Sequence, residues 1–407
     1  MGDVEIPRGG RARLGRVEGD LKAEGGVTVT PESAGPIEVT GRVRLRGDAT
    51  FEGSLTCQEL QAERGVVQVQ GNLVAQQGVE AERCELRVGG SLQAGEVDVD
   101  RALRVVGPVS SPRIEVGGEF EAQNSVTTDT LRVGGQVSIA GTLTARGAEV
   151  GGSAQFAEVA LESLEAGGRA SVKTGTIRRS IEAGGVFESS GPIEFGSLEV
   201  GGAVRLGGGS KGQTIEVGGK LTADGDLAFQ SLEIGGLGDI AGSVTGDSVE
   251  VGGQLDVGGA LRLTGTLEIG GRIRVVGALA CRAVEVGGEL RARRAVVGET
   301  LEVHGRLETS EGARARLIEL GRRSEATGPL FGEKVVLGRK CRADAVWGRT
   351  VEVGEGARVA EIVAESVELG ADAQVGRVQY VHEIRVGAGA QVGQPPEQIK
   401  EMPPFPL

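Results

Sequence analysis

The chain has 407 residues, of which 72 are glycine and only 10 are aromatic (8 Phe, 1 Trp and 1 Tyr), and its formal net charge at pH 7 is −13. Glycine usually makes up roughly 7 % of a protein, so this composition excludes an ordinary globular core, and the negative charge argues against nucleic-acid binding. Because there is no apolar run near roughly 18 residues, no signal-peptide stretch and no metal or disulfide pattern among the four cysteines, we expect a cytoplasmic protein without a metal site.

The N-terminal quarter contains short alternating segments at uneven spacing. Residues 1–36 are predicted to form a partly irregular N-terminal segment, and residues 37–113 to form less regular β-coils. The step from Leu103 to Ile114 is only 11 residues and contains two prolines. We therefore expect a break in the coils near 103–114.

Residues 114–393 repeat one phrase, aliphatic–charged–aliphatic–Gly–Gly, at an almost constant interval. The phrase first reads IEVGG at Ile114–Gly118, and its last loose copy is at Ile384–Gly387. From Gly117 onward, the position of its first glycine recurs through sixteen intervals that span 270 residues; twelve of them are 17, three are 16 and one is 18. A fixed short period of this kind is typical of a solenoid.

One period, residues 249–265, predicts the geometry of a coil. Its three segments, Val249–Val251, Leu255–Val257 and Leu261–Leu263, each place aliphatic side chains on one face and a charge on the other, as strands do. Gly-Gly or Thr-Gly separates them, which indicates sharp corners. The sequence therefore predicts an all-β, triangular parallel β-solenoid with about 17 residues per coil and roughly 20 coils.

The middle residue of the phrase is glutamate in eleven successive coils, which predicts an acidic ladder with rungs about 4.8 Å apart. The ladder is interpreted either as a solvated stripe relieved by nearby Arg and Lys or as a surface for cations or a basic partner. Its members are Glu149, Glu165, Glu182, Glu199, Glu216, Glu233, Glu250, Glu268, Glu285, Glu302 and Glu319.

A basic ladder is predicted at the corner that glycine holds elsewhere. Residues 290–350 contain 13 Lys and Arg against 8 Asp and Glu. The ladder is interpreted either as a solvated corner or as an attachment ridge for an acidic protein partner. Its members are Arg306, Arg322, Arg323, Arg339 and Lys340.

The two ends of a solenoid expose unpaired strand edges and the aliphatic core. No amphipathic helical cap is visible at either terminus, and residues 394–407 form a tail with five prolines that is expected to leave the solenoid. We therefore predict self-association through a C-terminal assembly region. This region comprises Ile384, Val386, Val392 and Phe405.

The VEVGG and LEIGG phrases on a 17-residue coil, without aromatics, resemble the bactofilins, a family of polymer-forming cytoskeletal proteins. The resemblance covers roughly residues 37–393. It implies a right-handed β-helix that assembles end to end into non-polar filaments without nucleotide, and a proline-containing tail similar to 394–407. This solenoid is several-fold longer than is usual in that family, so the resemblance implies a long or divergent member.

Catalytic chemistry is not indicated. His304 replaces a corner glycine and His382 precedes a glutamate on a late strand, and neither has a nucleophile or metal ligand at a suitable spacing. Cys281 is predicted to be a buried small hydrophobe. Hexapeptide-repeat acyltransferases, with 18-residue coils and a histidine-dependent active site, fit poorly. We expect no enzyme and no cofactor.

Three functional hypotheses follow. The first is a filament-forming cytoskeletal scaffold that polymerises end to end, with itself as the partner. The second is a non-polymerising solenoid that binds partners through its charged stripes, its ends capped by residues 1–36 or by the tail. The third, an exported adhesin or polysaccharide-active solenoid, lacks an export signal and aromatic platforms. Membrane association is left open.

Overall fold

The computed structural model describes residues 2–404, and these residues form strands, turns and bends with no helix among them. Consequently no helix in this part of the chain is long and apolar enough to cross a membrane. The strands pair in parallel to form a β-solenoid of about 23 turns, about 17 residues apart, which confirms the predicted fold and adds a few turns to the expected number.

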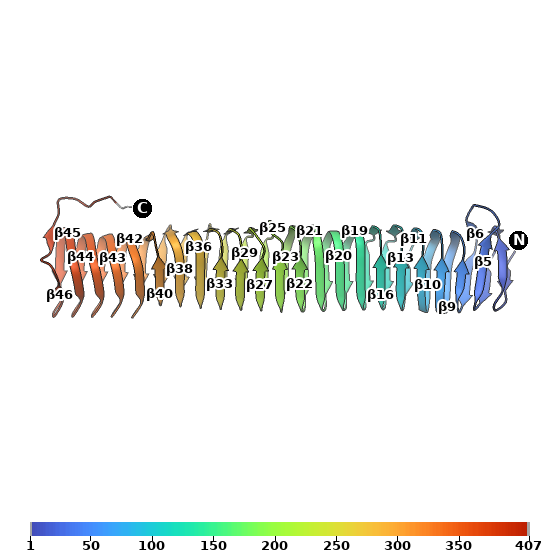
Figure 1. Ribbon diagram of the computed structural model, residues 1–407, viewed down its shortest axis with the longest axis horizontal. Coiled ribbons are helices and arrows are strands. Elements are labelled where there is room, and N and C mark those ends of the chain that lie inside the picture. Colours follow the sequence, from blue (N-terminus) through green and yellow to red (C-terminus); the bar gives the residue numbers. More distant parts are fainter. Residues whose placement is uncertain (1, 405–407) are drawn as a thin grey trace. The chain divides into compact units, whose positions relative to one another are not determined.

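The chain consists of two compact units, Met1–Gly201 and Gly202–Leu407. Within each unit the strands stack side by side in chain order (Figure 1). The strands of the first unit are β1 (Val4–Ile6), β2 (Arg11–Leu14), β3 (Arg16–Val17), β4 (Leu21–Glu24), β5 (Val27–Pro31), β6 (Ile37–Val39), β7 (Arg42–Arg46), β8 (Ala49–Phe51), β9 (Leu55–Val69), β10 (Leu73–Val88), β11 (Leu92–Ala94), β12 (Val97–Val99), β13 (Ala102–Val105), β14 (Val109–Ser110), β15 (Arg113–Val116), β16 (Glu119–Ala122), β17 (Val126–Thr127), β18 (Thr130–Val133), β19 (Gln136–Val150), β20 (Ser153–Ala166), β21 (Arg169–Ala183), β22 (Val186–Ser189) and β23 (Ile193–Val200).

The second unit continues the same architecture. Its strands are β24 (Ala203–Leu206), β25 (Ser210–Lys211), β26 (Thr214–Val217), β27 (Lys220–Ala223), β28 (Leu227–Ala228), β29 (Ser231–Ile234), β30 (Leu237–Ile240), β31 (Val244–Gly246), β32 (Ser248–Val251), β33 (Gln254–Val257), β34 (Leu261–Leu263), β35 (Thr266–Ile269), β36 (Arg272–Cys281), β37 (Ala283–Val286), β38 (Glu289–Val297), β39 (Thr300–Val303), β40 (Arg306–Thr309), β41 (Ala313–Leu320), β42 (Glu325–Leu337), β43 (Arg342–Val353), β44 (Arg358–Leu369), β45 (Gln374–Val386), β46 (Gln391–Val392) and β47 (Glu397–Gln398).

Each coil has three sides, and each side pairs only with the same side of the neighbouring coils. In the second unit the first side contains β26, β29 and β32, the second contains β27, β30 and β33, and the third contains β28, β31 and β34. The phrase predicted from the sequence occupies the first side. Longer strands such as β9 follow the chain around all three sides of one coil.

The core is a set of aliphatic columns. Val249, Val251 and Leu255 are at most 1 % exposed, while Glu250 between the first two is exposed. Burying such a side chain contributes about 1.5–3 kcal/mol relative to leaving it in water. Because each inward side chain is covered by the coils before and after it, neighbouring coils stabilise one another.

Strand pairing runs without interruption through 103–114, where a break was expected. Leu103 lies on the second side and pairs with Phe120, whereas Ile114 lies on the first side and pairs with Val97. The 11-residue step therefore joins two different sides of the solenoid. The break was predicted because the second side also carries the phrase, at Leu86–Gly90 (LRVGG), so that the spacing was measured between copies on two different sides.

The first coils begin earlier than expected. Val4 pairs with Leu21 and Leu21 with Val43, so residues 1–36 already contain strands β1 to β5. These two steps are 17 and 22 residues long (21 − 4 and 43 − 21). The longer turn contains the strand-free segment 32–36, which hid the period.

Candidate functional site

The acidic ladder has the predicted register within each unit. In the second unit each of its glutamates pairs directly with the next one along the first side, from Glu216 to Glu319. In the first unit the same holds from Glu149 to Glu199. Most of these side chains are exposed, and Glu302 and Glu319 are half-buried.

Most of the ladder lacks the expected relief by Arg and Lys. In the described chain, only Glu149 makes an ion pair with an arginine or lysine, to Arg132 at 2.7 Å, and the Glu302 carboxylate lies 2.9 Å from His304 Nε2. Like charges about 4.8 Å apart repel by about 0.9 kcal/mol in bulk-water dielectric before salt screening. The run Glu216–Glu285 is therefore an uncompensated line of negative charge.

The prediction of a basic ladder is only partly confirmed, because Arg306 does not lie in register with the other members. Arg306 begins β40 and pairs across the ladder with Glu325, to which it makes an ion pair at 3.2 Å. The remaining members lie at a corner, where the Arg323 N–H donates to the Arg339 carbonyl at 2.9 Å. Arg339 in turn makes an ion pair with Glu355 at 2.7 Å.

A change of corner geometry explains why Arg306 lies on a strand, whereas the other members of the basic ladder lie at a corner. Gly321 and Gly338 each begin a turn closed by a hydrogen bond, from the N–H of Ser324 and of Cys341 respectively. The third residue of each turn, Arg323 or Lys340, has a left-handed backbone (φ 61° and 59°). Each turn inserts extra corner residues relative to the Gly-Gly corners, so 17-residue spacing alone did not identify equivalent positions.

The last coil presents its aliphatic side chains to solvent. Ile384 and Val386 continue the columns of Val367 and Leu369, each of which is 2 % exposed. Val386 is 53 % exposed, and Ile384 and Val392 are half-buried. Phe405, the fourth residue predicted for this region, lies outside the described residues.

Part of the C-terminal tail stays on the solenoid. Strand β47 pairs with the third side of β45, and the Glu397 carboxylate makes an ion pair with Arg377 at 3.1 Å. Hydrogen bonds from the Gln379 amide and the Arg377 guanidinium lower the pKa of Glu397. The prediction that 394–407 leaves the solenoid is therefore wrong for this strand, because its polar side chains find partners on β45.

The N-terminal coil is better covered than the C-terminal one. Val4 and Ala12 are half-buried, whereas Ile6 is 5 % exposed and Leu14 is 7 % exposed. A turn closed by the Gly10 N–H and the Pro7 carbonyl lies against Ile6. The outer edges of β1, β2 and β3 have no strand partner among the described residues.

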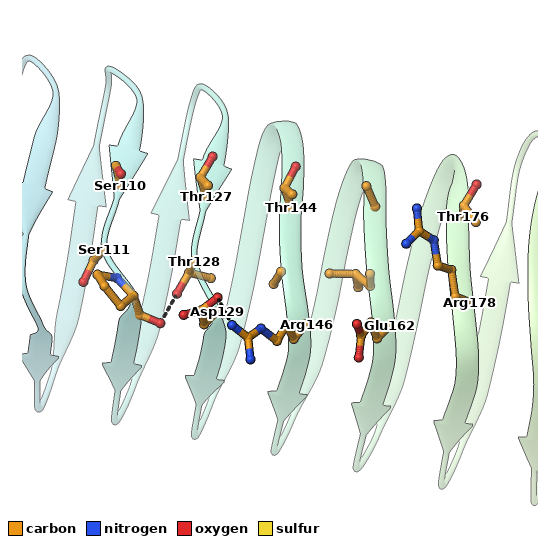
Figure 2. A pocket seen from close by; sticks show the side chains of 14 residues that line it. Ser110, Ser111, Thr127, Thr128, Asp129, Thr144, Arg146, Glu162, Thr176 and Arg178 are labelled. Atoms are coloured by element: carbon orange, nitrogen blue, oxygen red, sulfur yellow. Dashed lines mark hydrogen bonds and ion pairs between the residues drawn. The ribbon is translucent and has the colours of Figure 1, made fainter.

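Sequence reasoning missed an open groove of about 620 Å³ on the third side of the first unit. Figure 2 shows a row of hydroxyls, Ser110, Thr127, Thr144 and Thr176, along one part of it. The other part carries alternating charges, with Asp129 and Arg146 3.3 Å apart and Glu162 and Arg178 on the following coils. The signal was available as Ser-Ser, Thr-Thr and Thr-Ala at 17-residue spacing.

The side chains that commonly carry catalysis, the two histidines and the four cysteines, differ in exposure. His304 and His382 are both exposed, and within residues 2–404 no three His, Cys, Asp or Glu side chains meet in a way that could hold a metal ion. Cys281 is buried, as predicted, and burial raises the pKa of its thiol to about 12. The thiol of Cys57 has its pKa raised to about 12 by burial and by the charge of Glu59.

Comparison with protein-family models, with curated proteins and with solved structures gave no match to this chain.

Proposed function

We propose that this protein is a structural, self-assembling scaffold that polymerises end to end into filaments without nucleotide. The observation that carries the proposal is the open C-terminal coil. Val386 is 53 % exposed in a column whose preceding member, Leu369, is 2 % exposed. A further coil placed on this end would remove the exposed aliphatic surface from water, which is the dominant driving force for association.

Backbone chemistry supports the same proposal. An unpaired strand edge is a template for another strand, and at this end residues Ile384–Val386 pair only with β44 among the described residues. The addition of another coil needs no energy source, because it exchanges hydration of the edge for strand pairing and burial. The proposed scaffold therefore acts without catalysis or cofactor, and we propose the cytoplasm as its setting.

The test is negative-stain electron microscopy of the purified chain across a series of protein and salt concentrations. We expect filaments from the wild type and their loss in Val386→Asp, since a carboxylate cannot be buried in the contact without a partner. Val276→Asp is the matched control, because Val276 is 58 % exposed but lies in β36, away from either end of the chain. It should leave filaments intact.

Discrete particles at every concentration would contradict the proposal. The alternative would then be favoured, a partner-binding scaffold that uses the charged stripes. The uncompensated run Glu216–Glu285 would be its leading surface for a basic partner, and Arg322, Arg323 and Lys340 its leading surface for an acidic one. Equal loss of filaments in Val276→Asp and Val386→Asp would show that the end has no special role.

A further inference from the structure

We propose that assembly is head to tail: the C-terminal coil of one copy takes the N-terminal coil of the next copy as its following coil. This inference rests on the proposed end-to-end assembly and assigns its polarity. It differs from the non-polar arrangement that the resemblance to bactofilins implies. Three observations carry it: the direction of the backbone hydrogen bonds, the direction in which the chain circulates, and the charges at the two ends.

Backbone groups point in opposite axial directions at alternate residues. Inward-facing residues direct their N–H to the following coil, as Leu227 does to the Ser243 carbonyl at 3.0 Å and Val4 to the Asp20 carbonyl at 2.8 Å. Outward-facing positions direct theirs to the preceding coil, as Gly387 does to the Leu369 carbonyl at 2.8 Å.

By this alternation, Ile384 and Val386 direct their peptide groups away from β44, toward the side on which no further strand is described. Glu5, between Val4 and Ile6, directs its peptide groups away from β4, toward a side on which no strand is described. The two edges are therefore complementary for parallel pairing, Ile384–Val386 of one copy with Val4–Ile6 of the next. All the strand pairs inside the solenoid have the same parallel form.

The direction of the chain distinguishes the two kinds of contact. In a head-to-tail contact the chain circulates about the solenoid axis in the same sense on both sides of the junction, so facing strands stay parallel. Joining two C-terminal ends reverses that sense and makes facing strands antiparallel. The head-to-tail arrangement is thus the one that repeats the pairing already present between coils.

Charges at the two ends also match. On the first side, Glu368 pairs with Arg385 at the C-terminal end, and Glu5 pairs with Lys22 at the N-terminal end. Head-to-tail contact places Arg385, which also pairs with Glu383 of its own strand at 3.3 Å, next to Glu5, so the register positions Glu368, Arg385, Glu5 and Lys22 alternate in sign, while the flanking position sets Glu383 beside Asp3. A contact between two C-terminal ends with these strands opposed would instead place Arg385 against Arg385.

The third side gives an independent match. Among the strands of this side, β47 carries Glu397 at the C-terminal end, and β3 carries Arg16, whose register partner is Glu38, at the N-terminal end. In the same junction Glu397 follows Gln379 and precedes Arg16. Two sides of the coil therefore bring opposite charges together, and such complementarity fixes register and suppresses wrong contacts.

Cysteine cross-linking tests the polarity directly. Adjacent rungs are about 4.8 Å apart, within the Cα separation of roughly 4.4–6.8 Å that a disulfide requires. The four natural cysteines are buried, so background reaction is low. We expect a mixture of Glu5→Cys and Arg385→Cys chains, oxidised under filament-forming conditions, to give a cross-linked dimer on a non-reducing gel, and each variant alone to give none.

A charge exchange provides the second measurement. Arg385→Glu should raise the critical concentration for filaments by about tenfold or more, since it opposes two carboxylates at the junction. The double variant Arg385→Glu/Glu5→Arg should restore it to about the wild-type level, because the pair is re-formed with reversed charges. Arg262→Glu, which makes the same charge change on exposed β34, is the control and should have little effect.

The outcomes separate this inference from the proposed function. If the wild type forms no filaments at all, end-to-end assembly itself is wrong, and the polarity with it. If filaments form but Arg385→Cys cross-links to itself, or the double variant is not rescued, assembly stands and the head-to-tail arrangement is overturned.

Discussion

The two glycines of a Gly-Gly corner differ in how closely the preceding coil approaches them, although both are the same residue type. At the corner of residues 252–253, an added Cβ on Gly253 would overlap the Gly236 carbonyl oxygen of the preceding coil. The same atom on Gly252 would lie 3.1 Å from the Gly235 oxygen. Neither glycine has a positive φ. Close stacking of the backbone therefore explains the second glycine better than any special backbone conformation.

This difference predicts unequal effects of one substitution. Gly253→Ala should lower the free energy of unfolding by about 1–3 kcal/mol, because the overlap can be relieved only by moving a paired backbone. Gly252→Ala should cost clearly less, and urea unfolding followed by circular dichroism measures both. Equal midpoints for the two variants would contradict the stacking explanation.

At the residue scale the sequence predicted the character of most positions. Alternation identified inward Val and Leu and outward charges, because a strand turns successive side chains to opposite faces. It could not assign Arg306 to its rung, since equivalence depends on corner insertions at Arg322 and Arg323 that leave the glycine period almost unchanged. The hydroxyl row that includes Ser110 and Thr127 appears in the sequence as a repeat, but Ser and Thr alone do not form a catalytic or metal-binding motif.

At the scale of the strand, stacked side chains interact as ladders, and the same residue type takes opposite roles. Glu250 lies between Glu233 and Glu268 with no ion-pair partner in the described chain. Glu85 accepts from Arg87 at 2.8 Å and from Arg104 at 2.7 Å. The hydrogen bond from Arg87 and the charges of Arg87 and Arg104 lower the pKa of the Glu85 carboxyl.

We therefore expect replacement by glutamine to have opposite signs at the two positions. Glu250→Gln should raise the free energy of unfolding, obtained from urea titration, by a few tenths to about 1 kcal/mol at low salt, and the gain should shrink as salt screens the ladder. Glu85→Gln should lower the free energy of unfolding by about 1–2 kcal/mol at pH 7, because charged hydrogen bonds to two arginines are lost.

The pH dependence of Glu85→Gln provides a further check. Since the folded-state pKa of Glu85 lies below its ordinary value of 4.5, the stabilisation is present above that pH and is lost as the pH falls through the lowered value. The deficit of the variant should therefore shrink in acid. A deficit that persists at low pH would mean that Glu85 contributes packing rather than charge.

At the scale of the whole molecule, the period was sufficient to predict the fold, because each coil contacts only its neighbours. The state of the ends could not be derived in the same way. The pairing of β47 with β45 depends on individual contacts of Glu397 and Gln398 that occur once and have no repeat to reveal them. The early start of the coils was hidden for a related reason, since one long turn at 32–36 breaks the period.

A solenoid built from equivalent coils should tolerate the loss of one complete coil. Leu232 and Val249 are register partners, so deletion of residues 232–248 joins Ser231 to Val249 and leaves every remaining side in phase. We expect this variant to keep its strand signal in circular dichroism and to unfold at nearly the wild-type urea midpoint, because stability in such arrays comes from nearest neighbours. Deletion of only residues 232–240 is the control. It joins Ser231 to Ala241 and places a corner residue where the core column requires an aliphatic strand residue, so it should unfold or aggregate. If both deletions were tolerated alike, the coils would not be held in register by their three sides.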